Sequence, residues 1–115
     1  MAPGLVTAAK AERGKLPTDV WWHTIVSPTG LEKTGYPTQK PEGIVRRMVQ
    51  ASTRPGDWCL DFFAGSGTLG AVAAKLGRRF VLIDSNPEAV RVASERLGVS
   101  FCDERAKGRK PRKPP

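Results

Sequence analysis

The stretch "DFFAGSGTLG", residues 61–70, decides the fold. Its second half, from Gly65 to Gly70, fits the G-x-G-x-x-G pattern of a turn that joins a β-strand to an α-helix at a nucleotide-binding site. Glycines at such a turn let the backbone approach a ligand closely, and the following helix presents free N–H groups there. Several classes of cofactor enzyme share this pattern, and so do tight turns without a ligand. The residues around the turn therefore have to show whether it binds a ligand, and which one.

The residues on either side of the turn predict the alternating strands and helices of a parallel sheet. Mostly apolar runs of strand length, such as "DWCLDFF", are typical of strands covered on both faces. Asn86 or Ser85 is the expected N-cap of the second helix, and Gly77 and Gly98 follow the two helix ends. The predicted order is strand 57–63, helix 68–77, strand 78–84, helix 85–98 and strand 99–102. This order is half of a doubly wound α/β sheet.

Upstream of the turn, the sequence predicts one further helix and little regular structure. In "PEGIVRRMVQAS", apolar residues recur with helical spacing, and a proline stands near the first turn. The expected segments are a flexible lead-in 1–18, a short strand or extended packed segment 19–26, a loop 27–41 and a helix 41–52. The folded domain is expected over residues 19–104.

Charge is distributed unevenly along the 115 residues. The chain has a net charge of +8, but residues 105–115 hold six Lys or Arg and no acid, so the rest is nearly balanced. Because this tail has no aliphatic side chain larger than Ala, we expect it to be disordered. It is either a solvating terminus or a segment that lies along a phosphate backbone, and the sequence leaves both interpretations open.

Composition argues against a membrane protein and a metal protein. No run reaches the length of a membrane helix and none has the form of a signal sequence, so a cytoplasmic protein is expected. The single histidine and the two cysteines have no metal-ligand spacing, so no metal site is predicted. We expect both Cys59 and Cys102 to be small buried apolar groups.

Two carboxylates near the turn bear on its ligand. Asp84 ends the second strand, about 20 residues after the turn, where a carboxylate accepts ribose hydroxyls in nucleoside-binding folds. Asp61 stands four residues before Gly65. A carboxylate there opposes the pyrophosphate of NAD, because like charges at short range repel. It favours S-adenosylmethionine, which carries an ammonium and a sulfonium and no phosphate. NAD and a turn without a ligand remain the alternatives.

The loop before the predicted helix 41–52 adds a second set of candidate contacts. Thr38 and Gln39 precede a helix whose N-terminal amides attract a carboxylate, and Lys40 adds a cation. A zwitterionic ligand with its carboxylate here and its ammonium toward Asp61 would satisfy both ends. The methionine part of S-adenosylmethionine has this form.

The pair "PTQKP", residues 37–41, and "DFFAGSGT", residues 61–68, resembles the C-terminal part of the bacterial amino-group DNA methyltransferases. The resemblance runs from about Asp19 to Leu97. It implies a partial Rossmann-like sheet of the S-adenosylmethionine-dependent methyltransferases with flanking helices, and methyl transfer to adenine N6 or cytosine N4 of a base flipped out of DNA, in a restriction-modification system. The cofactor-binding residues that it implies are Thr38, Gln39, Lys40, Asp61, Phe63, Ala64, Gly65, Ser66, Gly67, Thr68 and Asp84.

One departure from the family affects activity. Its enzymes carry Asp or Asn followed by Pro-Pro and an aromatic residue, which binds the target amino group and stacks on the base. The only Pro-Pro in this chain is Pro114-Pro115, so we name no catalytic residue. The expectation is a truncated or split enzyme that is inactive alone and needs a second chain with the catalytic motif and the target-recognition segment. The alternatives are a noncatalytic nucleic-acid-binding remnant and a small NAD-binding protein. The remnant would bind phosphates through the tail and through Arg46, Arg47, Arg78 and Arg79.

Overall fold

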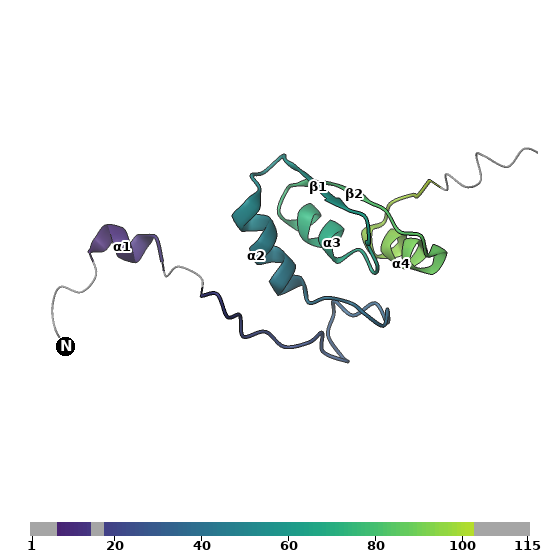
Figure 1. Cartoon of the computed structure of the whole chain (residues 1–115), viewed down its shortest axis with the longest axis horizontal. Helices are drawn as coiled ribbons and strands as arrows, with labels where there is room; N and C mark the ends of the chain where they lie inside the picture. The colour runs from purple at the N-terminus through teal and green to yellow at the C-terminus, as the bar shows by residue number, and fades with distance from the viewer. Residues whose placement is uncertain (1–6, 15–17, 103–115) are drawn as a thin grey trace, which may run out of the picture.

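The computed structural model describes residues 7–14 and 18–102 and forms one βαβ unit with additional helices (Figure 1). The elements are α1 (Ala8–Glu12), α2 (Glu42–Ser52), β1 (Trp58–Asp61), α3 (Thr68–Lys75), β2 (Arg79–Leu82) and α4 (Pro87–Leu97). Strands β1 and β2 pair in parallel, with Leu60 opposite Val81. Because α3 connects two parallel strands, the predicted α/β class is confirmed.

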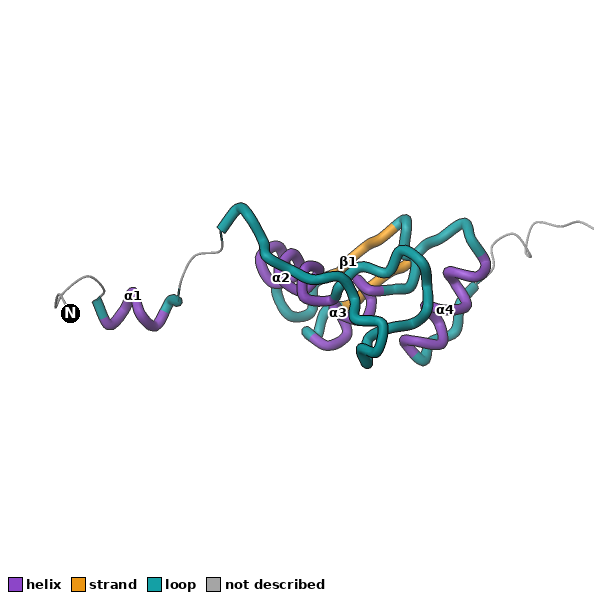
Figure 2. The backbone as a smooth tube through the Cα atoms, turned by 90° about the horizontal axis from the view of Figure 1, so that it is seen from below, coloured by secondary structure: helices purple, strands orange, loops and turns teal. Residues whose placement is uncertain are grey.

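Helices α2, α3 and α4 lie on one side of the sheet (Figures 1 and 2). Helix α3 packs against both strands and contacts α2 on one flank and α4 on the other. Its apolar residues and the inner sheet face form the core. The buried members of this core are Val49, Cys59, Val72 and Ala73, with Val45, Leu69, Leu76 and Phe80 partly buried around them. The carboxyl ends of the strands and the start of α3 therefore have a rigid support.

The other sheet face is uncovered, so the expectation of strands buried on both faces is wrong for the described residues. Side chains alternate between the faces of a strand. Cys59 and Phe80 point to the helices, whereas Leu60 and Val81 point away and are 53% and 43% exposed. The apolar runs are long enough for a sheet with helices on both faces, but helices cover only one face here.

The termini of the predicted domain also differ from expectation. Residues 99–102 form no strand, and Cys102 is exposed instead of buried, whereas Cys59 is buried as expected. Residues 19–26 pair with no strand and are mostly exposed. The sequence did not indicate α1, which lies within the expected lead-in. Residues 1–6, 15–17 and 103–115, including the basic tail, lie outside the described part of the chain.

Helix α4 begins and ends as its sequence predicts. The Asn86 side chain accepts a hydrogen bond from the backbone N–H of Glu88 at 3.0 Å, which settles the N-cap on Asn86. Gly98 follows the helix with a φ of 62°, a left-handed conformation that favours glycine. Within residues 7–14 and 18–102, no helix combines the length and apolar character that membrane crossing requires.

Candidate functional site

The glycine turn folds back tightly at the carboxyl end of β1. The N–H of Phe63 donates to Asp61 Oδ1 at 2.9 Å, and the N–H of Ala64 donates to the carbonyl of Ile83 at 3.1 Å. Gly65 and Gly67 have φ values of 52° and 74°, which other residues adopt at a cost of about 1–2 kcal/mol. The turn thus needs glycines at these two positions for its conformation.

Asp84 joins the second strand to this turn. Its Oδ2 accepts a hydrogen bond from the N–H of Gly65 at 2.9 Å, and its Oδ1 accepts one from the N–H of Asn86 at 2.8 Å. An ionised carboxylate has about four acceptor positions. Asp84 is therefore held in place by the backbone and keeps acceptor capacity for the hydroxyls of a ligand.

Asp61 has one oxygen committed to the turn. Its Oδ1 accepts from Phe63, and no other hydrogen bond to its carboxylate is formed by the described residues. The side chain is half-buried at the strand end. Asp61 can therefore accept a hydrogen bond from a cationic donor through Oδ2.

The loop with the P-T-Q-K-P motif lies against the turn. The Thr68 hydroxyl donates to the carbonyl of Lys40 at 3.3 Å, so two motifs that are 28 residues apart in the sequence meet. Thr38 and Lys40 are exposed. The structure thus brings the two sets of predicted site residues together.

The side chain of Gln39 is hydrogen-bonded within its own loop. Its Oε1 accepts hydrogen bonds from the N–H and the hydroxyl of Thr34, at 2.8 and 2.9 Å, and its Nε2 donates to the carbonyl of Glu32. The side chain therefore organises its own loop. Glu32 also reaches the start of α2, where its Oε2 accepts from the N–H of Glu42 at 3.1 Å. A carboxylate of the chain itself thus occupies an amide that we had expected to attract a ligand.

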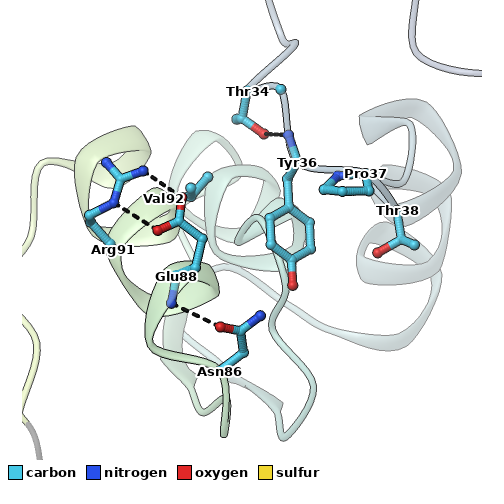
Figure 3. A pocket seen from close by; sticks show the side chains of 9 residues that line it. Thr34, Tyr36, Pro37, Thr38, Asn86, Glu88, Arg91 and Val92 are labelled. Atoms are coloured by element: carbon cyan, nitrogen blue, oxygen red, sulfur yellow. Dashed lines mark hydrogen bonds and ion pairs between the residues drawn. The ribbon is translucent and has the colours of Figure 1, made fainter.

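A cavity of about 460 Å³ opens between this loop and α4 (Figure 3). Its walls are residues 34–38 on one side and Asn86, Glu88, Arg91 and Val92 on the other. Tyr36 projects into it and also lies over the turn, since a Cβ added to Gly65 would be 3.5 Å from the Tyr36 ring. Sequence reasoning missed Tyr36, and its only signal is its place directly before the P-T-Q-K-P motif.

Three of the predicted site residues line one or the other of two cavities. Thr38 is the only one of them that lines the cavity of Figure 3. Ala64 and Asp84 line another, of about 570 Å³, which runs along β2 toward Phe101. Residues of α4 line both cavities, and the other predicted site residues line neither of them.

Arg96 is a second residue that the sequence analysis missed. Its guanidinium donates to the carbonyl of Ser66 at 3.2 Å, to Thr68 Oγ1 at 3.2 Å and to Glu42 Oε1 at 2.7 Å. Burial raises the pKa of Glu42, but the hydrogen bonds and charges of Lys75 and Arg96 outweigh it and hold that pKa below its ordinary value. No sequence pattern pairs Arg96 with a turn 30 residues earlier.

The arginines proposed for phosphate binding are partly engaged with the chain itself. Arg78 donates to the Thr53 hydroxyl and carbonyl, and Arg79 lies over the Trp58 ring at 4.8 Å. Arg47 lies over Trp21 at 5.4 Å.

Among residues 7–14 and 18–102, no three His, Cys, Asp or Glu side chains gather in a set suited to a metal ion.

Comparison with known proteins agrees with the turn and the loop motif. The sequence model of the N6/N4 family of DNA methylases matches residues 5–95. The chain belongs to this family. It is 45% identical over 84 residues to the type II methyltransferase M2.DpnII of Streptococcus pneumoniae, which covers 73% of this chain and 31% of that protein. It is 44% identical over 86 residues to the DNA adenine methyltransferase YhdJ of Escherichia coli K12, covering 75% and 29%.

A solved structure has a similar fold. The crystal structure of the M1.HpyAVI–SAM complex matches with a TM-score of 0.60 and 36% identity, over 74% of this chain and 43% of that one. This chain therefore spans about a third of the length of its curated relatives. It contains the part of a DNA methylase that surrounds the glycine turn.

Proposed function

We propose that the chain is the S-adenosylmethionine-binding part of a DNA methyltransferase that modifies adenine N6 or cytosine N4. The observation that carries this proposal is the hydrogen bond between Asp84 and the N–H of Gly65, which holds the carboxylate of Asp84 beside the glycine turn. The similar structure of M1.HpyAVI, which is a complex with SAM, supports it. The proposed partner is DNA, and the proposed location is the cytoplasm.

The chemistry of the residues fits this cofactor. Asp61 has an oxygen left for the ammonium group, and Asp84 has acceptor capacity left for the ribose hydroxyls. Exposed Lys40 supplies a cation for the carboxylate, since Glu32 already occupies one amide at the start of α2. When bound, the cofactor supplies an electrophilic methyl group on its sulfonium. The residues of this chain orient it.

The same residues make a dinucleotide a poor fit. A pyrophosphate at the turn would lie close to the carboxylate of Asp61, and like charges at such a distance repel. Membership of the DNA methylase family also favours S-adenosylmethionine over NAD. We therefore propose S-adenosylmethionine, and not NAD, as the ligand of the glycine turn.

We infer that another polypeptide segment supplies the catalytic motif. The 115 residues contain no Asp/Asn-Pro-Pro-aromatic sequence, and the chain spans only 29–31% of the length of two relatives. In the described structure, β1 pairs only with β2, so one edge of β1 is open. Apolar side chains on the uncovered sheet face, 43–60% exposed, give that segment a surface to cover; they are Trp58, Leu60, Val81 and Ile83.

A calorimetric titration tests the cofactor proposal. The full 115-residue chain, with its folding checked by circular dichroism, is titrated with S-adenosylmethionine and with NAD. We expect saturable one-site binding of S-adenosylmethionine alone. Asp61→Asn is the informative variant, because its amide oxygen can still accept from Phe63 but its charge is gone. It should bind S-adenosylmethionine more weakly by about 1.5–3 kcal/mol. A folded chain that binds NAD and not S-adenosylmethionine would contradict the proposal.

A further inference from the structure

Arg96 joins three elements that carry the candidate site. It projects from α4, and its side chain is only 10% exposed, compared with 53% for Arg91 on the same helix. One of its nitrogens bonds to the glycine turn at Ser66 and Thr68, and another bonds to Glu42, the first residue of α2. The guanidinium is thus shared between the turn and the helix that follows the P-T-Q-K-P loop.

The contacts of Arg96 reach the backbone of both motifs. The carbonyl of Ser66 belongs to the peptide unit that precedes Gly67, so the bond from Arg96 restrains the orientation of the turn. Thr68, which accepts from Arg96, donates in turn to the carbonyl of Lys40. Ser66 and Thr68 are 3% and 6% exposed, so water has little access to replace these bonds.

The shape of the guanidinium matters for this arrangement. Its planar fork has five N–H donors and binds two acceptors in fixed directions, whereas a lysine ammonium is a compact charge on a flexible stem. Glu42 is also paired with Lys75, whose side chain is 62% exposed and bonds to neither motif in the described structure. Lys75 therefore shares the charge interaction of Arg96 without its link to the turn.

We propose that Arg96 is a positioning residue for S-adenosylmethionine, holding the glycine turn and the P-T-Q-K-P loop in the relative placement at which both contact the cofactor. The inference rests on the proposed function. Arg96 acts through Ser66, Thr68 and Glu42, and it contacts no cofactor atom itself. Its loss should leave the cofactor's own contact residues present but misplaced.

The test compares three variants of the full chain: Arg96→Met, Arg96→Lys and Lys75→Met as the matched control. Calorimetry gives the affinity for S-adenosylmethionine, and hydrogen exchange of the apo chain gives the protection of amides in residues 36–42 and 64–68. We expect Arg96→Met to weaken binding about tenfold to hundredfold, as supporting partners of metal ligands do when removed, and to speed exchange in both segments. Arg96→Lys should fall between this variant and the wild type. Lys75→Met should change neither measurement.

Several outcomes separate the positioning role from the alternatives. Wild-type affinity and protection in folded Arg96→Met or Arg96→Lys would overturn the proposal, as would an equal loss in Lys75→Met, which would assign the effect to the charge of Glu42. If Arg96→Met does not fold, Arg96→Lys decides. If the wild-type chain binds no S-adenosylmethionine, the proposed function fails, and unchanged exchange in the Arg96 variants would then also remove the structural link.

Discussion

At the scale of one residue, Asp84 has an observed contact and a proposed role. It anchors the turn through Gly65 and is the candidate ribose acceptor. We predict that Asp84→Ala weakens S-adenosylmethionine binding by about 1.5–3 kcal/mol, the range for hydrogen bonds to a charged group. Titration calorimetry measures this change. Asp57→Ala is the matched control, because Asp57 likewise accepts from a backbone N–H, that of Arg54, but at the opposite end of the strands. Equal affinities in folded Asp84→Ala and the wild type would exclude the ribose role.

Gly67 is required for packing against α4. A Cβ at this position would lie 2.9 Å from the Ala93 Cβ. The space beside Gly67 is therefore filled by the packing of α4 and is not available to a ligand. Gly77 has a similar φ, 70° against 74°, with nothing within 4 Å of such a Cβ. We predict that Gly77→Ala lowers the free energy of unfolding by about 1–2 kcal/mol from backbone strain alone, and that Gly67→Ala lowers it further. Urea unfolding of both variants checks the order, and equal losses would contradict the clash with Ala93.

At the scale of elements, the ion pairs of Glu42 connect α2 with α3 and α4. The pKa of Glu42 is lower in the folded chain than its ordinary value of 4.5. A depressed pKa means that the folded state binds the proton less readily than the unfolded state. The stabilisation is therefore complete above about pH 4.5 and is lost as the pH falls through the folded value.

This linkage predicts a pH-dependent stability that Glu42→Gln should reduce. The free energy of unfolding of the wild type, from urea titrations between pH 7 and pH 3, should fall on acidification. In Glu42→Gln it should be lower at pH 7 and fall less steeply, because one group no longer takes up a proton on unfolding. A residual slope is expected from Glu88, whose pKa is lowered by its hydrogen bond with Arg91. Parallel curves for the two proteins would show that Glu42 makes no pH-dependent contribution.

Elements set by local chemistry are those that the sequence predicts well. Asn86 and Gly98 delimit α4 because a cap side chain and a left-handed glycine act within one helical turn. The carboxyl ends of parallel strands meet at one edge, so the encounter of Asp84 with the glycine turn was also predictable. The hydrogen bonds of Gln39 are not predictable from the sequence, because its partners Thr34 and Glu32 belong to an irregular loop without a repeating pattern. Arg96 was missed because its partners lie 28 to 54 residues away.

At the scale of the whole molecule, the main error concerned the cover of the sheet. Apolar strands predict two covered faces, and this prediction holds for a complete sheet. The described residues supply α2, α3 and α4 on one side only. Periodicity shows that a face is apolar, but it does not show which segment covers it. The exposed face is consistent with a chain that spans about a third of its relatives.

The uncovered face should make the isolated chain self-associate. Large exposed apolar patches and an open strand edge both promote association. Leu60 and Val81 are opposite each other on that face, so Leu60→Glu with Val81→Lys places an ion pair across the strands and removes apolar area without touching the core. We predict concentration-dependent association of the wild type in sedimentation velocity and a monomeric, folded double variant. Val72→Thr is the contrasting control: Val72 is 2% exposed, so this change should destabilise the fold and leave the patch in place. Undiminished association of the folded double variant would show that the chain associates through another surface. A monomeric wild type would show that this face is stable in water without a partner segment.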